Sequence, residues 1–139
     1  MHPTPLPDGQ QVFVDSFGEN PLEAIGHNMR IAQVRAPDPA ALKPHEIVLR
    51  IQSASVNRVD LLMTSGQYQH PPKPPYTPGL EYAGTVAWRG PLATGVEVGD
   101  RVLVDGLLAG PRSLGDYQAW GGFASYGVAG VTTLSPGMC

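Results

Sequence analysis

Residues 53–68 read SASVNRVDLLMTSGQY, and the interpretation of the whole chain starts from this stretch. A β-rich run ends near residue 56, and a short apolar segment follows an Asn and an Asp three residues apart. Asn57 is a favoured helix N-cap, and a carboxylate at Asp60 suits the positive end of a helix dipole. Gly66 can adopt the left-handed conformation that ends a helix. The stretch therefore predicts one capped helical turn, and it leaves open a second role for Asn57 and Asp60 as the floor of an active site.

The sequence on both sides of this stretch predicts strands and turns. In residues 47–56, Ile47, Leu49 and Ile51 alternate with Val48 and more polar residues, as expected for a strand with two different faces. The runs QVFVDSF and MRIAQVRA also alternate and predict an opening hairpin or meander, with NPLEAIG between them supplying turn residues. Further strand-like runs follow at residues 80–90, 96–106 and 121–134.

The composition agrees with a small β-rich domain. The chain has 139 residues, of which 17 are Gly and 15 are Pro, and only 15% are charged, so many turns and few long helices are expected. Five prolines in SGQYQHPPKPPYTPG, residues 65–79, exclude a central strand and predict a long loop of the kind that often carries function. We expect about seven short strands and one helical turn in a barrel or sandwich.

Charge, cysteine and hydropathy exclude several classes of protein. A net charge of −3 without a basic stripe gives no reason to expect nucleic acid. The only cysteine is Cys139, so no internal disulfide or thiolate zinc cage is expected, and the four histidines are far apart in the sequence. No leader pattern is visible, and no apolar run approaches the ~18 residues that a membrane span needs. The sequence predicts a soluble cytoplasmic protein with neither a nucleic-acid nor a membrane partner.

The N-terminus differs in character from the rest of the chain. Residues 1–10 contain three prolines, a Gly and an Asp, which predicts a flexible tail. We therefore expect a single domain that starts near Gln11 and includes residues 11–139.

Four motifs follow one another in an order and at a spacing typical of one protein family. They are SVNRVDLLMTSGQY, PYTPGLEYAGTV, GVEVGDRVLV and GGFASYGVA. From about Gln11 to about Leu134, the chain resembles the N-terminal GroES-like domain of medium-chain dehydrogenases/reductases, the alcohol dehydrogenase-like superfamily. More narrowly, it resembles the zinc-independent quinone oxidoreductase branch. The resemblance implies a mainly β, partly open GroES-like barrel with one or two short helices, and NADPH-dependent reduction of a quinone or an enone.

Two positions distinguish this chain from the zinc-dependent members of the superfamily. Those enzymes place a metal-binding Cys before x-x-Asp and a His inside Gly-His-Glu, whereas this chain has Asn57 and Leu80. An amide and an isobutyl group cannot replace a thiolate and an imidazole as zinc ligands. No zinc is therefore expected, and a substrate carbonyl would be polarised by hydrogen-bond donors, with the Asn57 amide as the candidate.

The resemblance also implies roles for neighbouring residues. Asn57 would contact the nicotinamide or the substrate carbonyl, Tyr68 would close over the ring or offer its hydroxyl, and Arg58 would belong to the cofactor site. For Tyr68, simple packing on Pro71 and Pro72 is an equal alternative. The remaining residues of the group would brace the helical turn and the following loop, in part through Arg58 or Arg101; they are Asp60, Gly66, Pro78, Gly79 and Glu81.

One part of a hydride-transfer site is missing from the sequence. Hydride transfer from NADPH needs a βαβ unit whose Gly-rich turn holds the pyrophosphate, and GGFASYG matches no such pattern. We therefore expect the Rossmann cofactor domain to be absent from this chain, which would be the substrate-side domain of a truncated reductase, inactive alone. The alternative is a stand-alone GroES-like binding or assembly module that forms a homo-oligomer through its strand edges.

Overall fold

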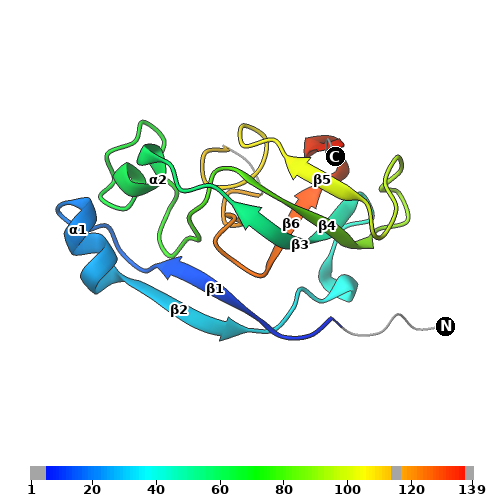
Figure 1. Cartoon of the computed structure of the whole chain (residues 1–139), viewed down its shortest axis with the longest axis horizontal. Helices are drawn as coiled ribbons and strands as arrows, with labels where there is room; N and C mark the ends of the chain where they lie inside the picture. Colours follow the sequence, from blue (N-terminus) through cyan, green and yellow to red (C-terminus); the bar gives the residue numbers. More distant parts are fainter. Residues whose placement is uncertain (1–5, 114–116, 137–139) are drawn as a thin grey trace.

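The computed structural model of the chain describes residues 6–113 and 117–136 (Figure 1). In these residues seven strands form a two-stranded and a five-stranded sheet, accompanied by two short α-helices. The strands are β1 (Gly9–Val14), β2 (Met29–Val34), β3 (Glu46–Ala54), β4 (Tyr82–Arg89), β5 (Arg101–Val104), β6 (Tyr126–Gly130) and β7 (Leu134–Pro136). The helices are α1 (Pro21–Glu23) and α2 (Arg58–Met63). The predicted mainly β, partly open barrel with one or two short helices is confirmed.

The predicted opening hairpin is also confirmed. β1 pairs antiparallel with β2, from Gly9 opposite Val34 to Val14 opposite Met29, and the pair lies along one side of the five-stranded sheet (Figure 1). Short bridges hold the hairpin to the rest of the molecule, since Val14 exchanges backbone hydrogen bonds with Tyr76 at 2.8 and 3.2 Å. The hairpin is therefore anchored to the Pro-rich loop that follows α2.

The packed part of the chain begins earlier than the predicted boundary at Gln11. β1 starts at Gly9, Leu6 packs against a cluster of buried residues, and the Pro7 carbonyl accepts a 2.8 Å hydrogen bond from the Tyr126 hydroxyl. No local sequence pattern indicates the bond between Pro7 and Tyr126, because the two residues lie 119 positions apart. Residues 1–5 of the predicted tail, with His2, and the C-terminal Cys139 lie outside the described residues.

The segment between β1 and β2 is more helical than the turn that the sequence predicts. α1 is followed by a π-helical turn at Ala24–Asn28. The side-chain oxygen of Asn20 accepts the Glu23 N–H at 2.9 Å, and Pro21 occupies the first helical position. An Asn N-cap followed by Pro is a helix start signal that our interpretation of NPLEAIG as a turn missed.

The five-stranded sheet curls around the main core. Its strand order is β6-β3-β4-β5-β7, all neighbours are antiparallel, and the nine-residue β3 lies between β6 and β4. A register shift between Ile51 and Ser53, opposite Gly84, marks a bulge in the β3–β4 pair. The two outer strands are consecutive in sequence, because β6 passes through a 3-10 turn at Val131–Thr133 directly into β7. The sheet therefore bends almost into a barrel.

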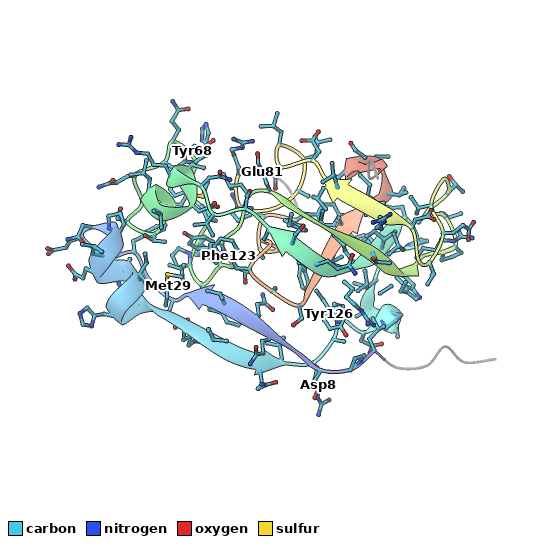
Figure 2. All side chains as sticks on the ribbon, in the orientation of Figure 1. Asp8, Met29, Tyr68, Glu81, Phe123 and Tyr126 are labelled. Atoms are coloured by element: carbon cyan, nitrogen blue, oxygen red, sulfur yellow. The ribbon has the colours of Figure 1, made fainter. Side chains whose placement is uncertain are left out.

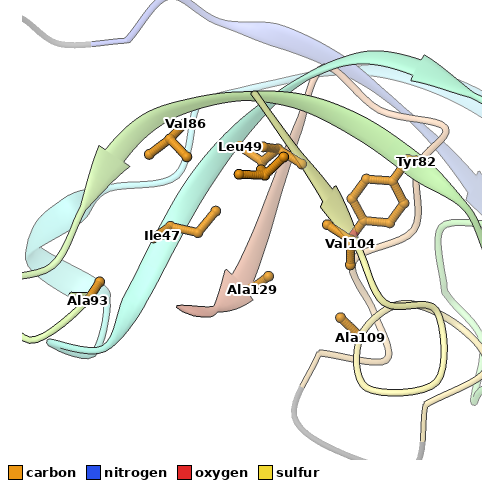
Figure 3. Close-up of a cluster of buried hydrophobic side chains, with 9 residues drawn as sticks. Ile47, Leu49, Tyr82, Val86, Ala93, Val104, Ala109 and Ala129 are labelled. Carbon is orange, nitrogen blue, oxygen red and sulfur yellow. The ribbon is translucent and has the colours of Figure 1, made fainter. Parts of the chain in front are cut away.

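The concave side of this sheet encloses the main hydrophobic core (Figure 3). Ile47 and Leu49 from β3 contact residues of β4, β5 and β6, with Tyr82 closing one end of the cluster. Val48, between them in sequence, packs on the opposite face with Tyr126 and Val128. The two faces of β3 thus follow the predicted alternation, and both are buried over residues 46–49.

A second cluster of buried side chains packs α2 against the β1–β2 hairpin. Val14 of β1, Met63 of α2, Tyr76 of the Pro-rich loop and Leu80 are all buried and in contact. These residues come from four separate segments, so burial of their apolar surface fixes α2 against the loop that leads into β4. Within the described residues, no helix is long and apolar enough to cross a membrane.

Candidate active site

α2 begins and ends as the sequence predicts. Asn57 is its N-cap, with an extended backbone, and its N–H donates to Asp60 Oδ2 at 2.8 Å in a capping box. At the other end, Gly66 has φ +73°, and its N–H donates to the Met63 carbonyl at 3.0 Å. This short helix therefore has defined ends, and the position of Asn57 follows from them.

Asp60 joins the helix to the segment that precedes β4. Its side chain is only 3% exposed, and its second oxygen, Oδ1, accepts the Leu80 N–H at 3.1 Å. Both carboxylate oxygens are thus bonded to backbone N–H groups, and bracing runs through the backbone, whereas the sequence suggested Arg58 or Arg101. A buried carboxylate is tolerated here because N–H groups and the helix N-terminus surround it.

A network of three side chains lies at the start of α2. The Ser55 hydroxyl donates to Glu81 Oε2 at 2.9 Å, and the Asn57 amide nitrogen donates to Ser55 Oγ at 3.0 Å and to the same Glu81 oxygen at 3.3 Å. Our sequence interpretation missed Ser55. A signal was available, because residues 53, 55 and 57 alternate along an extended chain and therefore project to the same side.

The loop at Pro78 and Gly79 is held by the glycine-rich segment that the sequence did not explain. The Gly79 carbonyl accepts the Gly122 N–H at 3.0 Å, and the Pro78 carbonyl accepts the Phe123 N–H at 3.0 Å. A Cβ added at Gly122 would lie 2.6 Å from the Tyr82 Cβ. GGFASYG therefore packs closely against Tyr82 and holds the Pro78–Gly79 loop through backbone hydrogen bonds.

Tyr68 and Arg58 lie apart from this network. Tyr68 is half-buried and packs against the second cluster, which contains Met63 and Tyr76, while Arg58 is exposed at the first position of α2. Figure 2 shows Tyr68 and Glu81 on the side of the molecule away from the β1–β2 hairpin. Hydrogen bonds join Asn57 to Asp60 and to Glu81, whereas the Gly79 carbonyl is bonded to Gly122. Tyr68 borders this group through apolar packing.

A groove of about 370 Å³ opens next to the three-residue network. Its lining comes from the end of β3, the start of β4 and Leu103 of β5, and includes Ser55 and Glu81 themselves. Leu103, the large aliphatic side chain in this lining, is 46% exposed. The groove therefore combines a few fixed polar groups with apolar surface, as small-molecule sites do.

Two tyrosines near the site remain protonated at neutral pH. Burial raises the pKa of Tyr82, whose hydroxyl donates to the Trp120 carbonyl at 2.8 Å. Burial, and to a lesser degree the charge of Asp60, also raises the pKa of Tyr76. The Tyr76 hydroxyl is buried without a hydrogen-bond partner in the described structure, so this side chain contributes mainly packing.

Residues that could bind a metal are sparse in this region. Among the described residues, no group of three or more His, Cys, Asp or Glu side chains could hold a metal ion. Leu80 is 2% exposed and belongs to the second cluster. Its isobutyl side chain itself offers no coordinating atom.

Comparison with known proteins identifies the family of this domain. Residues 43–136 match the alcohol dehydrogenase GroES-like domain, and the chain belongs to that family. Over 103 residues it is 31% identical to the quinone oxidoreductase of Lama guanicoe, which covers 74% of this chain and 27% of that relative. The resemblance to medium-chain dehydrogenases/reductases is thereby confirmed, and the chain spans about a quarter of the length of this relative.

Solved structures share the fold at lower identity. A mycobacterial protein complexed with NADPH aligns with a TM-score of 0.65 at 24% identity, covering 94% of this chain and 32% of its own. A cobalt- and zinc-bound alcohol dehydrogenase from Pyrobaculum aerophilum aligns with a TM-score of 0.71 at 23% identity, covering 95% of this chain and 42% of its own. The same fold therefore occurs in a protein that binds NADPH and in one that binds metal ions.

Proposed function

We propose that this chain is the substrate-side domain of an NADPH-dependent oxidoreductase that reduces a quinone or an enone without zinc. The observation that carries this proposal is the Asn57 amide, fixed at the N-terminus of α2 beside a groove with exposed apolar walls. The quinone oxidoreductase relative supports the reaction class.

Asn57 would act on the substrate as a hydrogen-bond donor. NADPH, when bound, supplies the hydride. As the acceptor is reduced, negative charge develops on its carbonyl oxygen, and an amide N–H that is already oriented stabilises that charge. Leu103 would contact the apolar ring of a quinone and help to exclude water. Tyr68 and Arg58 would lie at the border of the cofactor, as the family resemblance implies.

The residues of this chain fit one end of NADPH better than the other. The Asn57 amide, next to apolar surface, suits the nicotinamide ring and its carboxamide. The strand pairs of the described residues are all antiparallel, so they offer no βαβ turn for the pyrophosphate. We propose that a separate dinucleotide-binding domain completes the cleft, and that the 139 residues alone do not turn over.

Zinc independence follows from the chemistry of two side chains. Asn57 offers an amide and Leu80 a buried isobutyl group at the two positions where the zinc-dependent branch has its ligands. Neither is a thiolate or an imidazole, so carbonyl polarisation falls to hydrogen bonding.

The test is a chimera in which this chain replaces the matching segment of the Lama guanicoe quinone oxidoreductase. We expect quinone-dependent oxidation of NADPH, followed by its ultraviolet absorbance, that resists a zinc chelator. Asn57→Ala should lower kcat/KM by about 10²-fold, the typical effect of removing one such donor. Gln69→Ala removes an exposed carboxamide from the Pro-rich loop and should leave kcat/KM unchanged. Full activity in Asn57→Ala, or loss of activity with chelator, would contradict the proposal.

The isolated chain provides a second measurement. We expect no saturable NADPH binding at micromolar concentration in a fluorescence titration, because residues 6–113 and 117–136 include no βαβ turn for the pyrophosphate. Tight binding by the isolated chain would show that a separate dinucleotide-binding domain is not needed.

A further inference from the structure

The side-chain hydrogen bonds of Asn57 indicate how its carboxamide group is oriented. Ser55 Oγ, Glu81 Oε2 and Asn57 Nδ2 form a triangle with sides of 2.9, 3.0 and 3.3 Å. From these three sides, the two acceptors subtend an angle of about 55° at the amide nitrogen. The two N–H bonds of a planar primary amide diverge by about 120°. A single N–H directed between the Ser55 and Glu81 oxygens lies within about 30° of both, so one N–H can serve both acceptors.

The other polar groups of this side chain can be assigned in turn. At the start of α2 the amide oxygen faces the Asp60 N–H in the capping box, while that N–H is hydrogen-bonded to the Asn57 backbone carbonyl at 3.0 Å. With one N–H shared by the Ser55 and Glu81 oxygens, the second N–H remains for a ligand. The amide cannot rotate freely to offer its oxygen, because a flip would place that oxygen against the Glu81 carboxylate.

The two acceptors are themselves held by the backbone. The Ser55 N–H donates to the Glu81 carbonyl at 3.1 Å, and the next residues, Ala54 and Tyr82, pair in the β3–β4 ladder. On the other side of Glu81, the Leu80 N–H is bonded to Asp60. Glu81 is thus fixed from both directions, even though its carboxylate is exposed.

We propose that Ser55 and Glu81 are positioning residues that fix the Asn57 carboxamide and leave one N–H for a carbonyl oxygen of the acceptor. The identity of the ligand rests on the proposed function, but the orientation of the amide does not. Ser55 and Glu81 act through Asn57, and their effect is to select which of its polar groups faces the groove.

Solvent exchange of the two Asn57 side-chain hydrogens tests this orientation directly. In ¹⁵N-labelled chain, with the signals assigned by their loss in Asn57→Ala, we expect one N–H to exchange at least about 10-fold more slowly than the other. In the Ser55→Ala/Glu81→Ala double variant, the two rates should agree within about 2-fold. The single variant Ser55→Thr keeps a hydroxyl at position 55 and retains Glu81, so its two hydrogens should exchange at different rates, as in the parent chain.

The controls separate orientation from folding and from catalysis. Ser16→Ala and Glu19→Ala remove an exposed hydroxyl and an exposed carboxylate elsewhere and should leave the rate difference unchanged. The spectra of the double variant should otherwise match those of the parent chain. Equal exchange of the two hydrogens in the parent chain, or a difference that survives in the double variant, would overturn the proposal. Because neither NADPH nor a quinone is present, an inactive chimera would contradict the proposed function and leave this result standing.

Discussion

Asp60 Oδ1 accepts the backbone N–H of Leu80 at 3.1 Å, across twenty residues of sequence, while Asp60 Oδ2 accepts the N–H of Asn57. One buried carboxylate thus fixes the start of α2 relative to the residue before Glu81. The distance between Asn57 and Glu81, on which the amide orientation depends, is a consequence of this bond pair. Asp60 therefore organises the candidate site without facing the groove.

Asp60→Ala should destabilise the domain strongly. It leaves two backbone N–H groups without their acceptor in a buried place, so we expect a loss of about 3 kcal/mol in the free energy of unfolding, measured by urea denaturation. Asp60→Asn keeps one acceptor oxygen, so its free energy of unfolding should fall by less than that of Asp60→Ala. Asp8→Asn, at an exposed position, should stay within about 0.5 kcal/mol of the parent chain. An Asp60→Ala variant as stable as Asp8→Asn would show that the bond pair contributes little.

The fold could be predicted largely from local patterns. Alternation at Ile47, Leu49 and Ile51 gave the correct faces of β3, and the Asn57 to Gly66 stretch gave the correct ends of α2. These signals are local, because side-chain periodicity and capping depend on residues a few positions apart. The prediction of a turn at NPLEAIG was wrong, because Asn20 followed by Pro21 is a local signal for the start of a helix.

The candidate site was less predictable, because its contacts are long-range. Ser55 and Glu81 meet only after β3 and β4 have paired, and the Asp60 to Leu80 bond depends on how the Pro-rich loop returns to α2. Gly122 lies in close contact with Gly79, 43 positions earlier in the chain, and no local pattern indicates this contact. Pairing of distant backbone segments is set by tertiary packing, which no local pattern encodes.

Gly79→Ala should be far more destabilising than a matched glycine replacement. Gly79 has φ +110°, and an added Cβ would lie 2.6 Å from the Gly122 nitrogen, whereas Gly95 has φ +92° with no atom within 4 Å of an added Cβ. Gly95→Ala therefore measures backbone strain alone, about 1 kcal/mol, and Gly79→Ala adds a steric clash, for about 3 kcal/mol in total. Thermal unfolding of both variants gives the comparison. Equal losses would mean that the loop moves away from Gly122 at little cost.

The purified chain should contain no stoichiometric zinc. The Asn57 amide nitrogen faces Ser55 and Glu81 as a donor, and Leu80 lies in an apolar cluster, so no pair of ligands converges at these positions. Elemental analysis after dialysis against zinc and then buffer is the measurement. One zinc per chain, removed by a chelator with loss of structure, would refute the assignment of this domain to zinc-independent chemistry.

Alkaline pH should destabilise the domain through Tyr76 and Tyr82. Both pKa values are raised by burial above the usual value of 10, so the folded state keeps protons that the unfolded state releases. Stability should therefore be constant below pH 10 and fall above it, by up to about 1.4 kcal/mol per pH unit for each tyrosine. Urea denaturation from pH 8 to pH 11 measures this slope.

Two Phe variants separate the contributions of these hydroxyls. Tyr76→Phe removes a buried hydroxyl that has no partner, so at neutral pH the variant should be as stable as the parent chain or more stable by about 1 kcal/mol. Tyr82→Phe breaks the bond to the Trp120 carbonyl and should lose about 1 kcal/mol. Each variant should lose its own part of the alkaline slope, and the double variant should lose most of it. An unchanged slope in the double variant would place the alkaline transition elsewhere in the molecule.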